Sequence, residues 1–221
     1  MITVFLPCRK GSQRVKNKNI RPFAGIDGGL ARIKLEQLSK MKMVDEIILS
    51  TNDKDIIDIG QRLDIPQLKI DRRPEHLCTN ETTTDDLIKY VPSLTQNEHI
   101  LWTHVTSPFI QAKSYEAAIR IYFNNSTSEF DSLMSVTKLQ TFIWDQNGPI
   151  NYDREQQKWP FTQSLPPLYE VNSGIFISSR NNYIALNDRI GKKPYLYILD
   201  GKESFDIDWE EDFAIAEKMY N

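Results

Sequence analysis

Short apolar runs alternate with amphipathic segments along most of the chain. The apolar runs, rich in β-branched residues, predict buried strands at 2–6, 46–51, 67–70, 100–105, 132–137, 174–178 and 195–199. Apolar residues at helical spacing predict helices at 30–41, 53–63, 83–91, 113–123 and 209–220. Strands that alternate with helices of about a dozen residues are typical of α/β folds, so we expect a three-layer, Rossmann-like domain with helices on both faces of a mainly parallel sheet.

The alternation breaks between about residues 138 and 170. This stretch contains Trp144 and Trp159, and its Asn147-Gly148 pair between apolar residues predicts a β-hairpin. We interpret the stretch as a small β-rich excursion that carries substrate or dimer contacts, with a covering flap that has no function as the alternative. Residues 1–221 are therefore expected to form a single domain with one excursion.

The composition is that of a globular protein without an overall attraction to polyanions. Charged residues make up 26% of the chain and the formal net charge is −3, which argues against nucleic acid or an anionic membrane as a partner. No apolar stretch approaches the roughly 18 residues of a membrane span, and no signal peptide is recognisable before the first strand. Cys8 and Cys78 have neither a zinc nor a disulfide spacing. We therefore expect a cytoplasmic protein.

The segment after the first predicted strand is strongly basic. It carries six cations, at Arg9, Lys10, Arg14, Lys16, Lys18 and Arg21. Gly11 permits a tight turn that directs backbone N–H groups at an anion, and Ser12 adds a hydroxyl donor. Because ligands of α/β sheets bind at the carboxyl ends of the strands, the segment predicts a phosphate site. A solvated basic loop is the alternative.

The loop reads Leu6-Pro7-x-Arg9-x-Gly11-Ser12-x-Arg14-x-x-x-Lys18-Asn19. This order resembles the signature of the CMP-sialic acid synthetase family, also called acylneuraminate cytidylyltransferases. The resemblance implies that the loop wraps the phosphates and ribose of CTP, and that Arg9 and Lys18 take part in catalysis. The nucleotide-binding residues that it implies here are Leu6, Arg9, Gly11, Ser12, Arg14, Lys18 and Asn19.

A second matching segment implies a site for the cytosine base. Arg73-Pro74-x-x-Leu77 precedes a threonine-rich stretch at 79–84, as in the family. The resemblance implies that Arg73, Thr79 and Thr83 recognise the base, whose edge offers an amine donor beside two acceptors. Thr83 has an alternative role as the N-cap of the helix predicted at 83–91.

The turn after the fourth long strand resembles the place where the family binds the sugar acceptor. His104 stands where the family usually has glutamine. Contact with the sugar is the main expectation for this histidine, and general-base catalysis is the alternative. The acceptor-binding residues that the resemblance implies are His104, Thr106, Ser107, Lys138, Asn172 and Phe176.

The excursion departs from the family at the basic residues that meet the sugar carboxylate. Gln140 and Thr162 stand at the corresponding places. Lys138, Arg154 and Lys158 are the candidate substitutes. The nucleotide half of the site thus resembles the family more closely than the acceptor half.

Two aspartates near the end of the chain predict a metal site. Asp206 and Asp208 are two positions apart, so on an extended segment both face the same side. Two carboxylates beside a triphosphate suit Mg²⁺, which completes its shell with phosphate oxygens and water. The resemblance assigns both aspartates to the metal and Asp208 to catalysis. The alternative is that the acidic residues form the N-terminus of the helix predicted at 209–220, where they stabilise the helix dipole.

Together, the resemblance implies an enzyme that uses Mg²⁺ to transfer CMP from CTP to an acidic sugar, releasing pyrophosphate. Sialic acid or a related nonulosonate is the expected acceptor, with a Kdo-like sugar or a phosphonate as alternatives. A homodimer is expected from the resemblance alone. A sugar 1-phosphate nucleotidyltransferase and a CTP sensor without turnover are the rival readings. RNA binding is disfavoured because the basic patch is short and lacks interleaved aromatic residues.

Overall fold

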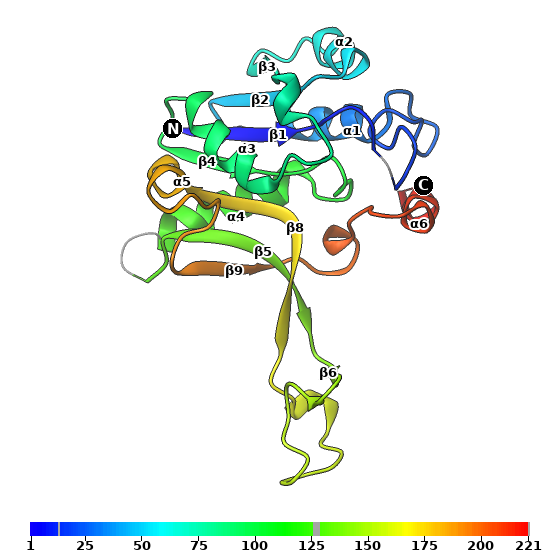
Figure 1. The fold of residues 1–221 in the computed structure, drawn as a ribbon, viewed down its shortest axis with the longest axis vertical. Helices are drawn as coiled ribbons and strands as arrows, with labels where there is room; N and C mark the ends of the chain where they lie inside the picture. Colours follow the sequence, from blue (N-terminus) through cyan, green and yellow to red (C-terminus); the bar gives the residue numbers. More distant parts are fainter. Residues whose placement is uncertain (13, 126–128, 221) are drawn as a thin grey trace.

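The computed structural model describes residues 1–12, 14–125 and 129–220. Within them, helices cover a seven-stranded sheet from which a narrow excursion projects (Figure 1). The sheet strands are β1 (Ile2–Pro7), β2 (Glu46–Thr51), β3 (Leu68–Arg72), β4 (His99–Trp102), β5 (Ser132–Leu139), β8 (Leu168–Ser179) and β9 (Pro194–Ile198). The α-helices are α1 (Gly29–Leu38), α2 (Lys54–Arg62), α3 (Thr84–Tyr90), α4 (Ala112–Asn125), α5 (Arg180–Leu186) and α6 (Glu210–Tyr220). Short 3₁₀ helices span Glu75–Leu77, Val91–Ser93, Thr162–Ser164 and Gly201–Ser204.

The sheet is mainly parallel, as predicted. Its strand order is β3-β2-β1-β4-β8-β5-β9. Among the described strands of this sheet, only β8 runs against its neighbours, pairing antiparallel with both β4 and β5. The remaining pairs, β1 with β2 and β4, β2 with β3, and β5 with β9, are parallel. The carboxyl ends of β1, β2 and β4 therefore meet at one edge of the sheet.

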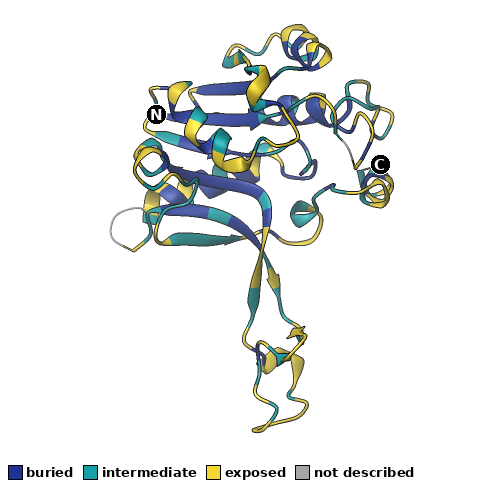
Figure 2. Ribbon diagram, viewed as in Figure 1, coloured by how far each residue is buried: buried dark blue, intermediate teal, exposed yellow. Residues whose placement is uncertain are grey.

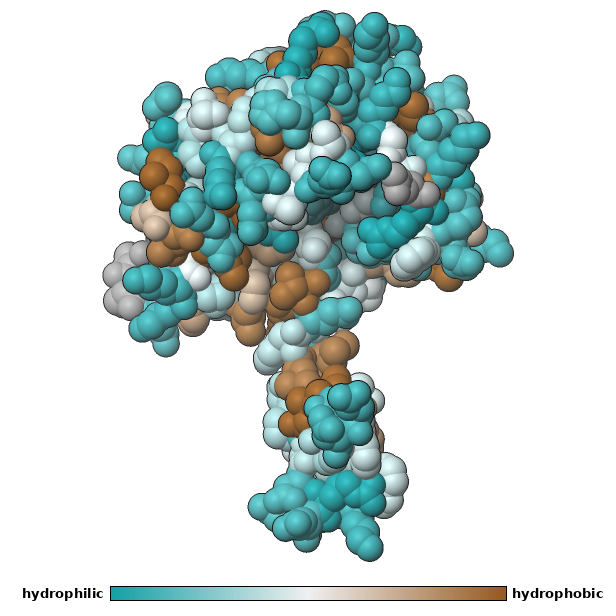
Figure 3. Space-filling model, in the orientation of Figure 1, coloured by the Kyte–Doolittle hydropathy of each residue, from teal (hydrophilic) through white to brown (hydrophobic). Residues whose placement is uncertain are grey.

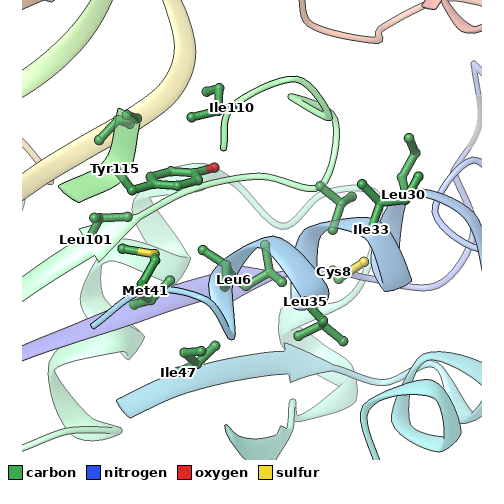
Figure 4. Packing of buried hydrophobic residues seen from close by; sticks show 14 of the residues in the cluster. Leu6, Cys8, Leu30, Ile33, Leu35, Met41, Ile47, Leu101, Ile110 and Tyr115 are labelled. Carbon is green, nitrogen blue, oxygen red and sulfur yellow. The ribbon is translucent and has the colours of Figure 1, made fainter. Parts of the chain in front are cut away.

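Successive side chains along each strand point to opposite faces of the sheet, so the core consists of one cluster on each face. On β1, Val4 and Leu6 join the cluster that packs under α1, α4 and α6, whereas Phe5 joins the cluster under α3 and α5. Figure 4 shows part of the first cluster, in which Leu6 lies beside residues of α1. Trp102 of β4 belongs to the second cluster and meets Phe5 edge to face at 4.8 Å. Buried residues on both faces confirm the predicted three-layer α/β fold.

The excursion begins as a two-stranded ribbon. The strands β5 and β8 continue beyond the sheet, with Lys138 opposite Tyr169, and most of the segment is exposed (Figure 2). Beyond this ribbon, β6 (Trp144–Asp145) and β7 (Gly148–Pro149) form the hairpin that the Asn-Gly pair predicts. The Asp145 carboxylate accepts hydrogen bonds from the backbone N–H groups of Asn147 and Gly148, which fixes this turn.

Two elements differ from the sequence-based expectation. Strand β8 begins at Leu168, inside the predicted excursion, because the ribbon continues the ladder of the sheet. Helix α5 was not predicted, since among its residues only Tyr183 is buried and the helical period of apolar residues is weak. Its start is nevertheless fixed by Ser179, whose hydroxyl accepts from the N–H of Asn182. None of the described helices is both long and apolar enough to cross a bilayer.

Candidate active site

A cavity of about 410 Å³ lies where β1 and β4 end. Its lining comes mainly from the loop after β1 and the turn after β4: Pro7, Cys8, Arg9, Ser12, Arg14, Lys18, Asn19, Asn80, His104, Val105 and Thr106. The fold thus gathers five of the predicted nucleotide-binding residues and two of the predicted acceptor-binding residues around one space. Its position at the carboxyl ends of parallel strands is the usual place for a ligand in such a sheet.

A second cavity, of about 190 Å³, adjoins the first. Pro7, Arg9 and His104 line both, so the two spaces share one wall. The remaining walls of the smaller cavity are Arg73, Leu77, Thr82, Thr83, Thr84, Leu87 and Trp102. These walls combine apolar surface from Pro7, Leu77, Leu87 and Trp102 with hydrogen-bonding side chains, and a flat heterocyclic base with polar edges requires both.

The basic loop is held by hydrogen bonds from both of its ends. Gly11 has a φ of 80°, a left-handed conformation that glycine adopts without strain. The guanidinium of Arg9 donates to the Thr79 carbonyl at 3.0 Å and to the Asn80 amide oxygen at 2.8 Å. The Asn19 side chain donates to the Arg9 carbonyl at 3.1 Å. Arg9 therefore joins the loop to the threonine-rich segment that borders the smaller cavity.

Lys18 connects the loop to the acidic segment near the end of the chain. It is only 7% exposed, and its ammonium donates to the Ile207 carbonyl at 2.6 Å. The N–H of Ile207 in turn donates to the Thr106 carbonyl at 3.0 Å. Burial lowers the pKa of Lys18, while the charges of Asp208 and Asp206 oppose that shift. Lys18 thus places a positive charge between the cavity and two carboxylates.

Asp206 and Asp208 are not among the residues that line the two cavities, but they lie next to Lys18 and Arg14, which line the larger one. Asp208 forms an ion pair with Arg14 at 2.8 Å, and Ser107 donates to Asp206 at 3.5 Å. Burial raises the pKa of Asp206, and the charge of Asp208 raises it further. A divalent cation would relieve both the burial and the repulsion, so the pair fits Mg²⁺. Among the described residues, no group of three or more His, Cys, Asp or Glu side chains forms a fuller metal set.

His104 is a neutral hydrogen-bond donor in this geometry. Burial, together with the charges of Arg189 and Lys18, lowers its pKa to about 3. The Trp102 indole donates to His104 Nε2 at 3.0 Å, so this nitrogen is the acceptor and the proton is on Nδ1. A neutral imidazole whose acceptor is already occupied is suited to donate to a ligand rather than to take its proton.

The residues predicted to recognise the cytosine base also form hydrogen bonds within the protein. Arg73 is only 4% exposed and donates to the Ser50 hydroxyl and carbonyl at 3.0 and 2.5 Å. Thr83 caps α3 in a reciprocal pair with Asp86, as its alternative role predicts. Both still line the smaller cavity. Thr79 lines neither cavity, and its carbonyl is the group that Arg9 contacts.

Several other predicted residues lie beside the cavities rather than in their walls. Leu6 is fully buried and supports the loop from the core. Ser107 is buried below its turn, where its carbonyl accepts from Lys34 at 2.8 Å. Lys138 lies on the ribbon of the excursion, paired with Tyr169 and away from the cavity walls.

Asn172 and Phe176 are part of β8 rather than of the cavity walls. The register of β5 and β8 shifts between Met134 and Val136. There Asn172 accepts from the Ser135 hydroxyl at 2.6 Å and donates to Thr137 at 3.2 Å, which holds the irregular segment in place. Phe176 is 2% exposed and belongs to the core cluster of Trp102.

Sequence reasoning missed two contributors to the site. Asn80 lines the larger cavity and binds Arg9; its only sequence signal is its place in the polar turn after Thr79. Lys34 is fully buried in α1 and donates to the Ser107 carbonyl and the Tyr115 hydroxyl, each at 2.8 Å. A lysine at an inward position of an amphipathic helix is the signal that could have revealed it.

Cys8 lines the cavity but is not a nucleophile. Burial raises the pKa of its thiol to about 12, so the sulfur stays protonated at neutral pH. It acts as a small apolar wall residue, and its backbone N–H extends the parallel ladder by donating to the Ser50 carbonyl at 2.9 Å.

Comparisons with known proteins agree with this geometry. The family model for cytidylyltransferases matches residues 3–220. N-acylneuraminate cytidylyltransferase of Escherichia coli O18:K1:H7 (strain RS218 / NMEC) is 25% identical over 222 residues, 97% of this chain and 51% of that protein. CMP-N,N'-diacetyllegionaminic acid synthase of Legionella pneumophila subsp. pneumophila is 26% identical over 227 residues, 99% of this chain and 95% of that protein. The chain therefore spans about half the length of the first relative and nearly all of the second.

A solved structure shares the fold. CMP:2-keto-3-deoxy-manno-octonic acid synthetase complexed with CTP superposes with a TM-score of 0.67 at 12% identity, over 99% of this chain and 98% of that one. The family match extends over the sheet, the basic loop and the Asp206–Asp208 segment alike. The resemblance expected from the sequence is thus confirmed, and the chain belongs to the cytidylyltransferase family.

Proposed function

We propose that this chain is a magnesium-dependent cytidylyltransferase that transfers CMP from CTP to an acidic sugar and releases pyrophosphate. The observation that carries the proposal is the larger cavity at the ends of β1 and β4, because Lys18 and Arg14 in its wall also contact the segment that carries Asp206 and Asp208. The adjoining smaller cavity has the size and lining for a base. The names of the relatives support a nonulosonic acid as the acceptor.

In this proposal the triphosphate lies along the basic loop. Arg9, Arg14 and Lys18 bind its oxygens and stabilise the charge that develops as pyrophosphate leaves. Backbone N–H groups around Gly11 and the Ser12 hydroxyl add neutral donors. Asp206 and Asp208 would hold Mg²⁺, which supplies additional charge neutralisation at the phosphates.

The acceptor lies on the His104 and Thr106 side of the cavity. Its hydroxyl oxygen forms a bond to the α-phosphorus, the bond from this phosphorus to pyrophosphate breaks, and the hydroxyl proton is released to solvent. His104 donates through Nδ1 and orients the acceptor, because its other nitrogen already accepts from Trp102. Most of the rate enhancement then comes from positioning and charge stabilisation rather than from a protein base.

Pyrophosphate release tests this function directly. Each of the four NTPs is incubated with Mg²⁺ and a panel of nonulosonic acids, 2-keto-3-deoxy-manno-octonic acid and phosphonates. We expect release only with CTP and one class of acceptor, and a loss of about 100-fold or more in Asp206→Ala and Asp208→Ala. Glu211→Ala, on the exposed start of α6, is the matched control and should retain activity within about twofold.

Each alternative gives a different result in the same assay. Release with an NTP other than CTP and a sugar 1-phosphate would replace the proposal with the rival transferase. CTP binding without turnover on any acceptor would replace it with a sensor. Activity that survives loss of both aspartates would exclude them as the metal site.

We further propose a cytoplasmic homodimer that forms through the excursion. Trp144, Trp159 and Phe161 of the excursion are 47%, 67% and 81% exposed, and hydrophobic side chains also gather where it leaves the sheet (Figure 3). Exposed aromatic side chains at this density favour a protein contact. Sedimentation should give twice the chain mass of 25.7 kDa, and a monomer at micromolar concentration would contradict the dimer.

A further inference from the structure

Arg189 packs on Phe176 and Trp102, of which Trp102 lines the smaller cavity, and Arg189 itself is not among the residues that line the two cavities. It follows α5 by three residues, and its guanidinium carbon is 3.7 Å from the ring centroid of Phe176 and 5.3 Å from that of Trp102. Trp102 lines the smaller cavity, and its indole N–H holds His104, which lines both cavities. The rings therefore hold a cation next to the Trp102–His104 pair.

This guanidinium lacks an oxygen partner within the described part of the chain. It donates no hydrogen bond and forms no ion pair there, although it is partly buried. Burial lowers its pKa, and the electrostatic effects of Tyr183 and Asp188 oppose that shift. An arginine does not lose its proton in a protein, so the planar face and the five N–H donors remain cationic.

The other cations around the site already have oxygen partners. These contacts join Arg9 to Thr79 and Asn80, Arg14 to Asp208, Lys18 to Ile207, Lys34 to Ser107, and Arg73 to Ser50. Three of these cations, Arg9, Arg14 and Lys18, belong to the basic loop and face the triphosphate in the proposed function. A separate cation is needed if the acceptor is also an anion.

The excursion does not supply that cation within one chain. Arg154 stacks between Trp144 and Trp159, at 5.2 and 5.6 Å from their ring centroids. Gln140 is uncharged and donates to the Leu165 carbonyl at 2.5 Å, inside the excursion. The excursion projects away from the sheet edge that carries the cavities (Figure 1).

We propose that Arg189 is a specificity-determining residue that binds the carboxylate of the acceptor sugar from the His104 side of the site. The inference rests on the proposed function, since it names the group that recognises an acidic acceptor. A planar guanidinium held flat on Phe176 and Trp102 keeps its edge free for two parallel N–H···O bonds to a carboxylate. The neutral Nδ1–H of His104 adds a donor for a sugar hydroxyl. The charge of Arg189 also contributes to the low pKa of His104, in agreement with their proximity.

The test compares an acidic acceptor with its neutral C1-amide in wild type, Arg189→Met and Arg189→Lys. Methionine keeps an unbranched, polarisable chain on the two rings, so packing is retained while the charge is lost. Arg120→Met, an exposed arginine of α4 that pairs with Glu116, is the matched control. The probes are N-acetylneuraminic acid, N,N'-diacetyllegionaminic acid and 2-keto-3-deoxy-manno-octonic acid, each with CTP and Mg²⁺, with thermal melting to confirm folding.

In Arg189→Met, we expect KM for the acidic acceptor to rise about 10- to 100-fold, while KM for CTP and the rate with the amide change by less than about threefold. Arg189→Lys should recover part of the preference for the acid. A purely structural arginine would instead lower activity equally on the acid and on the amide, and that result would overturn the inference. If the wild-type protein uses one of the acids and Arg189→Met keeps the same preference for this acid over its amide, the inference is also overturned. The proposed function then remains intact. Wild type that uses none of the three acids would contradict the acceptor class and the inference together.

Discussion

Lys18→Met is expected to reduce turnover of CTP by about 100- to 1000-fold. The ammonium lies in the wall of the larger cavity and donates to the Ile207 carbonyl at 2.6 Å. The substitution therefore removes a charge that faces the triphosphate and also releases the segment that carries both aspartates. Pyrophosphate release at saturating CTP, with thermal melting as the folding check, measures the effect.

Lys16→Met is the matched control for this loss. Lys16 is exposed in the same loop and lines neither cavity, so its variant should keep turnover within about twofold. If a folded Lys18→Met protein kept as much activity as Lys16→Met, the catalytic assignment of Lys18 would be wrong.

Lys34→Ala is expected to lower the free energy of unfolding by about 3–5 kcal/mol. The side chain is fully buried between α1 and the turn after β4, where it contacts the carbonyl of Ser107 and the hydroxyl of Tyr115. Its removal leaves a cavity and two polar atoms without their donor. Urea unfolding followed by far-UV circular dichroism measures the difference.

Two further variants separate the causes of that effect. Lys40→Ala, exposed just beyond the same helix, should change the free energy of unfolding by less than about 0.5 kcal/mol. Lys34→Met keeps much of the volume, so it should cost less than Lys34→Ala. Equal costs for Lys34→Ala and Lys40→Ala would mean that the buried lysine is not supporting the turn.

The same position predicts a pH dependence. Burial lowers the pKa of Lys34 in the folded state to about 7, below the roughly 10.4 of an unfolded lysine. Between these values the unfolded chain binds more protons at this site, so the free energy of unfolding rises with pH relative to Lys34→Met, by at most about 1.4 kcal/mol per unit. Below pH 7 the difference should become constant.

That the residues of the basic loop line one cavity could be predicted because they are contiguous in the sequence. Arg9, Arg14 and Lys18 lie in one loop after a clear apolar strand, and that strand's place in the sheet fixes where the loop ends. The alternation of strands and helices was sufficient to predict the three layers and the mainly parallel sheet. The Asn-Gly pair was sufficient for the hairpin in the excursion.

The acceptor half could not be predicted in the same way because it depends on strand order. That β8 inserts between β4 and β5 is invisible in the local pattern, yet it brings Phe176 beside Trp102. Arg189 then reaches this face from the segment after α5, a short helix with few buried residues. Asn172 and Phe176 were singled out by resemblance, whereas their hydrogen bonds and burial became visible only with the register of β8.

The contacts of Lys18 with Ile207 and of Arg14 with Asp208 join residues 189 and 194 positions apart. During synthesis on the ribosome, the basic loop leaves the exit tunnel long before the segment at 206–208 has been translated. A nascent chain that lacks this segment has the cationic half of the site without its carboxylates. Assembly of the complete site therefore waits until residues 206–208 have been translated, and a chain that stops before residue 206 would carry the basic loop without the two carboxylates.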